Sequence, residues 1–496
     1  MTASILVPIS RLTYLFAAAA LLLPAQVSTT PCIRGTFRDY HNQPKNRQPP
    51  RDWTGPVFKL SQQYPDVLPA MGDYPWLDKS IRVENGQIKN PAAYLEAVKR
   101  YVLAGNTASS EIVNFGDNKV RPWFHIPWMD YEPTGREFTH GLTHEIDSRP
   151  GFLDVNQTGI SSTWAVSGIN DRGGWAIGQV WCRPEKASDT DPYPDAYMLN
   201  PDEERPNSFP NGTAEVKFLF TTGGPDQIPW LKNTLEWQAD INQLAPHPKD
   251  KPFEPCDGDG KGCRRGESCN IGVCFTGRKP GKVYLMQVDV AVRDDRTVTG
   301  WAFGTFAYNA RSSGATVFDR LVPIGLMWGN DPGITELAVK RHDATIKESW
   351  INPAADPVNP DGTPKPNGMF GVGNHLGYAG RLNGPADQAT SSCLSCHMTS
   401  GLRKPKEGSI VPDSVPIVWQ GYDANMKQEQ QLNWFINLPA GVTFSYDSYV
   451  SLDYQLQLGM GIRSFFESRA KNSKEKTHEF TTARDVVPAT LKKKGK

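Results

Sequence analysis

Two cysteines and a histidine late in the chain have a spacing that permits one particular covalent chemistry. Cys393 and Cys396 are three positions apart, and His397 follows directly. Two thiols at this spacing can add across the two vinyl groups of one haem, and the adjacent imidazole can then bind the iron from one side of the ring. A zinc site would need four ligands, and no second CxxC or CxxH pair follows. A thioredoxin-type pair would open a helix after a strand, whereas Gly, Pro, Asn and Ser precede this motif.

The motif resembles the haem-attachment site of a c-type cytochrome, and the resemblance is confined to the motif itself. It implies one covalent haem c, bound through Cys393 and Cys396, with His397 as the proximal ligand of the iron. It also implies electron transfer to or from a redox partner protein. A di-haem peroxidase is excluded, because the sequence contains one CxxCH motif.

The second axial ligand of the iron decides the chemistry, and the sequence leaves two kinds of candidate. By the same resemblance, a methionine some tens of residues downstream would supply it, which points to Met460 or Met426. Even-numbered positions from Leu452 to Ile462 are all apolar, so Met460 can equally face a core. Among the imidazoles His140 is the best distal candidate, and three others follow it: His144, His125 and His375.

Residues 121–150 hold a dense group of aromatic, histidine and arginine side chains. Trp123 and Trp128 could pack against a haem, and Arg136 and Arg149 could meet its propionates. An ordinary aromatic-rich loop with surface histidines explains the same composition equally well.

The approach to the motif, residues 352–387, is rich in Pro, Gly and Asn and cannot be regular structure over its length. Loops of this size in a compact protein are usually functional, although a simple linker is the alternative. Glycines at 377, 380 and 384 would let the backbone approach a flat macrocycle, and Arg381 could bind a propionate.

The elements that must position these residues are predicted to be mainly strands. Segments 213–221, 283–292, 301–308 and 321–328 are rich in β-branched and aromatic residues and are followed by turn residues. Several alternate apolar and polar side chains, which is typical of antiparallel strands with one buried face. Residues 164–169 and 175–181, joined by Asp-Arg-Gly-Gly, predict a hairpin, and residues 91–103 predict an amphipathic helix. The fold class expected is mainly β, an antiparallel sandwich or jelly-roll-like scaffold with irregular loops.

Charge and the N-terminus limit location and partners. The 496 residues include 53 basic and 53 acidic ones, so no long-range field favours nucleic acid or an anionic membrane. Residues 12–25 form an apolar stretch after Arg11, followed by small residues, which predicts a cleaved export signal and no stable transmembrane span. We therefore expect a periplasmic or secreted protein.

The cysteine count agrees with export. Eight cysteines, less the two of the motif, leave six, which predicts three disulfides, two of them inside a Gly-rich insert and the third between Cys32 and Cys182. The organisation expected is as follows: signal peptide 1–27, an irregular and α-helical region 28–150, a β-rich scaffold 151–350 with the disulfide-rich insert 256–274, a haem-binding segment 351–470, and a polar tail 471–496.

Three functional hypotheses follow. The favoured one is an exported mono-haem cytochrome c-like protein that transfers electrons, with no catalytic residue assigned. The second is a haem-dependent enzyme or gas-binding protein whose open iron site faces His140 or Arg136. The third is an exported ligand-binding β protein with an accessory haem. No Gly-rich phosphate loop, HExxH motif or GxSxG elbow is present, so the CxxCH motif is the most specific signal in the sequence.

Overall fold

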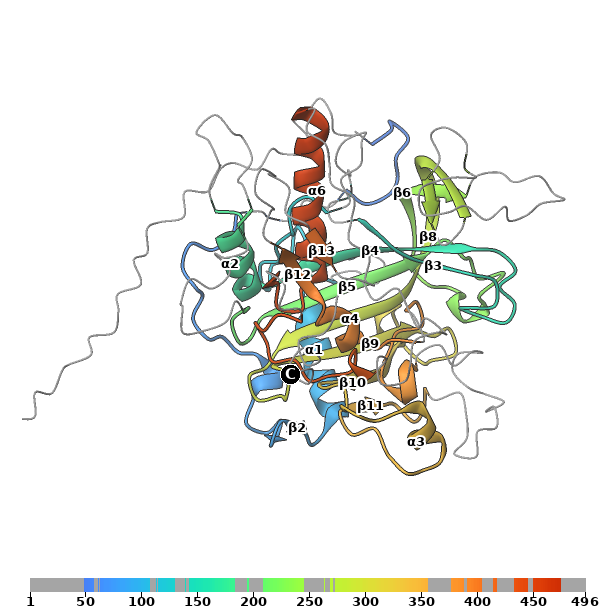
Figure 1. Ribbon diagram of the computed structural model, residues 1–496. Coiled ribbons are helices and arrows are strands. Elements are labelled where there is room, and N and C mark those ends of the chain that lie inside the picture. Colours follow the sequence, from blue (N-terminus) through green and yellow to red (C-terminus); the bar gives the residue numbers. More distant parts are fainter. Residues whose placement is uncertain are drawn as a thin grey trace, which may run out of the picture.

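The structure is a computed structural model (Figure 1). It describes residues 49–57, 61, 63–107, 113, 115–129, 139, 142–182, 194–195, 208–244, 263, 268–270, 273–355, 376–387, 390–403, 414–416, 432–444 and 449–473. The expected signal peptide, His140, Arg136, His375, Met426, Cys32 and residues 474–496 of the polar tail lie outside these ranges.

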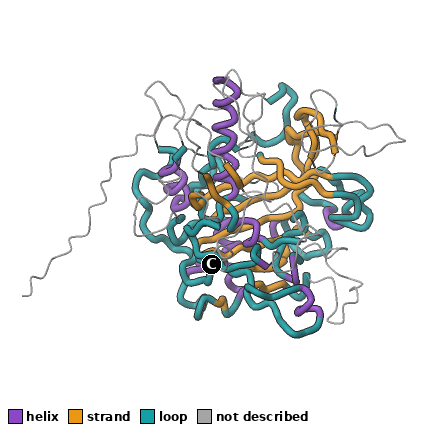
Figure 2. Tube along the Cα trace, viewed as in Figure 1, coloured by secondary structure: helices purple, strands orange, loops and turns teal. Residues whose placement is uncertain are grey.

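One antiparallel sheet dominates the described residues, and Figure 2 shows its strands gathered through the centre of the molecule. The strand order is β11-β10-β9-β8-β5-β4-β3, and β6 and β7 also pair with β8. Its strands are β3 (Thr143–Ser148), β4 (Ser161–Ile169), β5 (Ala214–Thr221), β6 (Glu236–Leu244), β7 (Ser268–Asn270), β8 (Val273–Arg293), β9 (Trp301–Tyr308), β10 (Leu321–Met327) and β11 (Ser349–Ile351). The mainly β, antiparallel prediction is confirmed.

Smaller elements surround this sheet. Two further sheets contain β1 (Val83–Glu84) with β2 (Gln87–Ile88), and β12 (Ser400–Arg403) between β13 (Ser414–Pro416) and β14 (Tyr449–Ser451). The α-helices are α1 (Pro91–Leu103), α2 (Asp171–Val180), α3 (Glu336–Lys340), α4 (Cys393–His397) and α6 (Leu456–Ser473), and the 3-10 helices are η2 (Pro75–Leu77), η4 (Pro229–Leu231), η5 (Phe318–Arg320) and η6 (Tyr378–Gly380).

Helix α1 packs against the apolar face of the large sheet, where it contacts β5, β8 and β10. The Asn90 side chain accepts a hydrogen bond from the backbone N–H of Ala93 at 3.1 Å, and Pro91 occupies the first helical position. The buried residues of α1 are Tyr94, Leu95, Ala97, Val98, Tyr101 and Val102. Burial of a large apolar side chain of this kind contributes about 1.5–3 kcal/mol. The predicted helix 91–103 is confirmed at both ends.

The opposite face of the same sheet is polar. Strand register places Ser167, Lys217, Asp289 and Thr305 in one row across β4, β5, β8 and β9. Residues of α4 and of the first turns of α6 line a cavity together with this face, so the C-terminal part of the chain covers it (Figure 1). Alternation along these strands predicted one buried face, and the structure encloses the polar face as well.

The hairpin predicted at 164–181 is wrong in its second half, because helix α2 follows β4. The Asn170 side chain caps this helix by accepting a hydrogen bond from the N–H of Gly173 at 3.2 Å. A Cβ at Gly173 would lie 2.3 Å from Ile169 Cγ1, and one at Gly174 would lie 2.6 Å from Phe124 Cδ2. The glycine pair therefore serves close packing of a helix and does not form a turn.

The apolar residues at even-numbered positions from 452 to 462 do not all lie in one extended segment. From Leu456 onward the chain is helix α6, which carries Met460. Gly461 faces the backbone of another segment, since a Cβ there would lie 2.3 Å from the carbonyl oxygen of Pro127. Glycine is usually unfavourable inside a helix, but at position 461 it lets α6 approach its neighbour closely.

A single hydrophobic core contains buried residues from Tyr64 to Phe466, so the scaffold and the segment after residue 350 share it. Cys263 and Cys274 form a disulfide with an S–S distance of 2.02 Å, which confirms one crosslink within the predicted insert, and Cys182 is disulfide-bonded too. In the described part of the chain, no helix combines the length and the apolar character needed to cross a membrane.

Candidate functional site

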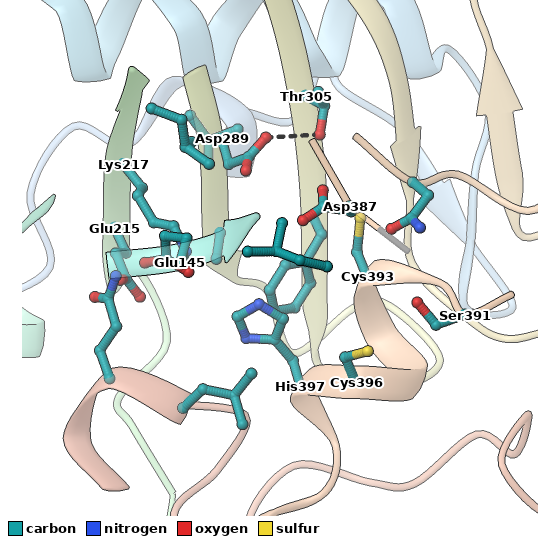
Figure 3. Close-up of a pocket in the computed structure, with 18 of the residues that line it drawn as sticks. Glu145, Glu215, Lys217, Asp289, Thr305, Asp387, Ser391, Cys393, Cys396 and His397 are labelled. Carbon is teal, nitrogen blue, oxygen red and sulfur yellow. Dashed lines mark hydrogen bonds and ion pairs between the residues drawn. The ribbon is translucent and has the colours of Figure 1, made fainter. Parts of the chain in front are cut away.

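The CxxCH motif lines a cavity of about 420 Å³ between the polar face of the sheet and the C-terminal segment. Ligand pockets typically measure about 300–1,000 Å³. Figure 3 shows Cys393, Cys396 and His397 projecting from α4 on one side, and Glu145, Glu215, Lys217 and Asp289 on strands on the other. Apolar residues complete the lining: Leu219, Val290, Ala291, Phe303 and Leu456.

A reciprocal cap starts α4 and so fixes the position of the motif. The Ser392 hydroxyl accepts a hydrogen bond from the N–H of Ser395 at 3.1 Å, and the Ser395 hydroxyl accepts one from the N–H of Ser392 at 2.8 Å. Ser392 Oγ in turn donates to Asn330 Oδ1 at 2.8 Å. The cap orients the two thiols and the imidazole of one helical turn toward the same cavity.

Cys393 and Cys396 are free thiols in a chain that forms disulfides elsewhere. Burial raises the pKa of both thiols, to about 11 for Cys396. The pair is therefore protonated in the folded protein. Two reduced, adjacent thiols on one helical turn are the donor set that covalent haem attachment requires.

The imidazole of His397 is oriented by the backbone. Its Nδ1 lies 2.8 Å from the carbonyl oxygen of Tyr454, so Nδ1 carries the proton and Nε2 keeps its lone pair. Burial lowers the pKa of His397 to about 4, against the opposing effect of that carbonyl. Phe303 supports the ring with a centroid separation of 4.6 Å. A neutral imidazole whose Nδ1–H binds a carbonyl is the usual form of a metal-ligating histidine.

The carbonyl that orients His397 belongs to a strained turn. Asp453 and Tyr454 have φ values of 50° and 70°, in the left-handed region that few residues other than glycine adopt. The Asp453 carboxylate accepts hydrogen bonds from the N–H of Phe209 at 2.6 Å, Trp301 Nε1 at 3.1 Å and the N–H of Gly441 at 2.7 Å. These three bonds hold the turn, and with it the carbonyl of Tyr454.

Of the distal-ligand candidates, the structure brings Met460 to the cavity wall, where it is half-buried. His144 lines the same wall, where its ring stacks on Trp164 at 4.8 Å and its Nε2 bonds Asp147 Oδ1 at 2.9 Å. His125 is buried away from the cavity. Met460 and His144 are thus the described candidates that line the cavity, and the ring of His144 is already bonded to Asp147.

Two further expectations of residues near a haem are wrong. Arg381 is fully buried and donates to the carbonyl oxygens of Asn330, Tyr378, Asp331 and Ile334, so it fixes the approach loop and is not available to a propionate. Trp123 and Trp128 belong to the hydrophobic core and do not line the cavity. Among the described lining residues, Lys217 is the one Lys or Arg side chain.

The ionisable residues facing the motif were not predicted from the sequence. Six acidic or basic side chains line the cavity: Glu145, Asp147, Glu215, Lys217, Asp289 and Asp387. The available signal was a charged residue inside an otherwise apolar strand, as at Lys217 in β5 and Asp289 in β8. It was interpreted as the solvent side of the sheet.

Enclosure changes the protonation of this group. Burial raises the pKa of Glu215 to about 7, although Lys217 opposes the shift. Burial also raises the pKa of Asp289 and of Asp387. Burial alone would lower the pKa of Lys217, yet the carboxylates of Glu145, Asp289 and Asp387 raise it. Lys217 is thus charged and lies 3.0 Å from Glu145 Oε2, while Glu215, Asp289 and Asp387 hold protons more strongly than usual.

No family model matches the sequence, and neither a curated protein nor a solved structure shows significant similarity to the chain. Within the described ranges, no group of three or more His, Cys, Asp and Glu side chains is arranged to hold a metal ion. The interpretation of the cavity therefore depends on its own residues.

Proposed function

We propose that the protein is an exported mono-haem c protein that transfers electrons to or from a redox partner protein. The observation that carries the proposal is the joint placement of Cys393, Cys396 and His397, which lie on one helical turn and line one cavity of about 420 Å³. The thiols would hold the haem by thioether bonds, and Nε2 of His397 would bind the iron.

The residues of the cavity fit such a group. The thiols are unpaired with each other, the imidazole has the tautomer of a ligand, and Phe303, Ala291 and Leu456 supply apolar surface. Lys217 is the described residue suited to an anionic propionate. A haem bound here would supply a one-electron redox centre, and the chain would fix its orientation and limit its contact with water.

The decisive experiment is to express the full chain in a host that attaches haem c and to extract the purified protein with acidified acetone. We expect the pigment to stay with the polypeptide and the reduced protein to show a low-spin haem spectrum that carbon monoxide does not change. A colourless protein, or one that loses its pigment to the solvent, would refute the proposal.

A second candidate is a haem enzyme or gas-binding protein, and the ionisable residues on the cavity wall favour it. Glu215, Asp289 and Lys217 could move protons to a small ligand on the iron. The same spectra separate the two functions, because an open iron site binds carbon monoxide rapidly and a six-coordinate carrier does not.

If Met460 is the second axial ligand, its replacement by leucine will open the iron site. We expect the Met460→Leu protein to become high-spin, to bind carbon monoxide and to have a lower reduction potential than the parent, because thioether ligation raises the potential. Met398→Leu is a matched control, since Met398 is buried, does not line the cavity and contacts Asn330 Nδ2 through its sulfur at 3.7 Å. Identical spectra for parent and Met460→Leu would assign the ligand elsewhere.

A further inference from the structure

Two carboxyl groups on the cavity wall meet at a single amide. Gln287 Nε2 donates to both carboxylate oxygens of Asp289 at 2.9 Å and lies 3.4 Å from Asp387 Oδ2. Asp289 belongs to β8, whereas Asp387 comes from the loop before α4, and Figure 3 shows their side chains directed toward each other. The two acids are therefore neighbours although they are far apart in the sequence.

Backbone hydrogen bonds hold the loop before α4 close to Gln287. The N–H of Ala386 donates to Gln287 Oε1 at 3.1 Å, and the N–H of Gly384 donates to Asp387 Oδ2 at 3.0 Å. A Cβ at position 384 would lie 2.2 Å from Gln287 Nε2 and 2.3 Å from Asp387 Oδ2, so a larger residue would displace these two side chains. The two backbone N–H groups of the loop therefore help to position the pair of acids.

The cavity contains too little positive charge for its acids. Glu145, Asp147, Glu215, Asp289 and Asp387 line it. Asp147 bonds His144 Nε2 at 2.9 Å, and Lys217, which bonds Glu145 at 3.0 Å, is the single Lys or Arg among the described lining residues. Two carboxylates that share a poorly solvated site cannot both ionise easily. Thr305 Oγ1 donates to Asp289 Oδ1 at 2.8 Å, so hydrogen bonds, and not a second cation, hold the pair.

We infer that Asp289 and Asp387 form a proton-binding site that takes up one proton when the iron held by the adjacent motif gains one electron. This inference rests on the proposed function. One electron from the partner protein reduces ferric to ferrous iron, and one proton from solvent binds the carboxylate pair, so the charge inside the cavity is unchanged. On oxidation the electron returns to the partner and the proton to solvent.

The groups facing the pair set the direction of this coupling. Burial favours the protonated form of both acids, and Glu145 on β3 favours protonated Asp387, whereas Lys217 on β5 favours the ionised acids. Cys393 on α4 faces the pair too, but as a thioether it would not titrate. Loss of one positive charge at the iron raises the proton affinity of the pair. The reduction potential should therefore fall as pH rises over one interval. This interval lies between the pKa of the acid pair in the oxidised protein and its higher pKa in the reduced protein.

The test is the midpoint potential of the holoprotein from about pH 5 to about pH 9. We expect a range in which the potential falls by about 59 mV per pH unit, the value for one proton per electron. Reduced-minus-oxidised infrared spectra should show a protonated carboxyl band that shifts in D2O. A haem-containing protein with a pH-independent potential would overturn this inference and leave the proposed function intact, whereas a protein without haem would overturn both.

Variants assign the proton to the pair. Asp289→Asn and Asp387→Asn should each flatten the pH dependence and remove the carboxyl band. Glu336→Gln is the control, because Glu336 is exposed on α3 and bonds Lys340 at 2.8 Å outside the cavity. Both cavity variants retaining the parent slope would assign the proton to another group and refute the inference.

Discussion

Replacement of both Cys393 and Cys396 by serine is expected to abolish covalent pigment completely. Each thiol forms one thioether bond in the proposed arrangement, so each single variant should keep one bond and the double variant none. Acid–acetone extraction followed by a haem stain of the denatured chain measures the effect.

The matched control is the double variant Cys263→Ser and Cys274→Ser, which removes the disulfide between those residues. It should keep its covalent pigment and lose about 2–4 kcal/mol of unfolding free energy, as is typical for loss of a disulfide. Covalent pigment in the Cys393/Cys396 double variant would mean that other residues attach the haem.

Asp453→Ala should produce the largest loss of stability among single substitutions near the site. The carboxylate is fully buried and accepts bonds from Phe209, Trp301 and Gly441, and its removal leaves these donors unsatisfied. We expect a loss of about 3–5 kcal/mol in urea-induced unfolding. Because Tyr454 follows directly and its carbonyl orients His397, the haem spectrum of any folded variant should also become heterogeneous.

Two further variants, Asp453→Asn and Asp319→Asn, test whether the loss of stability comes from removing the hydrogen bonds of a buried carboxylate. An amide at 453 keeps the shape but places its NH2 group against a donor, so we expect a smaller loss of about 1–3 kcal/mol. Asp319 bonds Thr316 in an exposed turn, and its substitution should change stability by about 0.5 kcal/mol or less. An Asp453→Ala protein as stable as the parent would show that the strained turn holds without its carboxylate.

Local signals predicted several elements well. Helix α1 was predictable because Asn90, Pro91 and the apolar periodicity all lie within the helix or next to it. Strand β9 was predicted with its observed bounds, since Trp301–Tyr308 is rich in aromatic residues and is followed by the turn residue Asn309. The motif itself was found because its chemistry depends on spacing along the chain.

What the sequence could not reveal depends on distant partners. The glycines of α2 look like a turn until Phe124 packs against them, and Gly461 looks like a helix breaker until α6 meets Pro127. Lys217 and Asp289 become a cavity wall only because residues 383–397 and 456–460, distant in the sequence, cover them. Arg381 was expected at a haem because its contacts with Asn330 and Asp331 are invisible in the sequence.

The covering of the sheet by the last part of the chain has a consequence for biogenesis. Strands β3–β11 are synthesised before α4 and α6, so the polar face of the sheet stays uncovered until these helices have been made. Once α4 and α6 have packed against the sheet, both thiols of the motif have a raised pKa and little thiolate remains to react. If haem c is attached as proposed, its attachment to Cys393 and Cys396 should therefore precede the packing of α4 and α6 against the sheet.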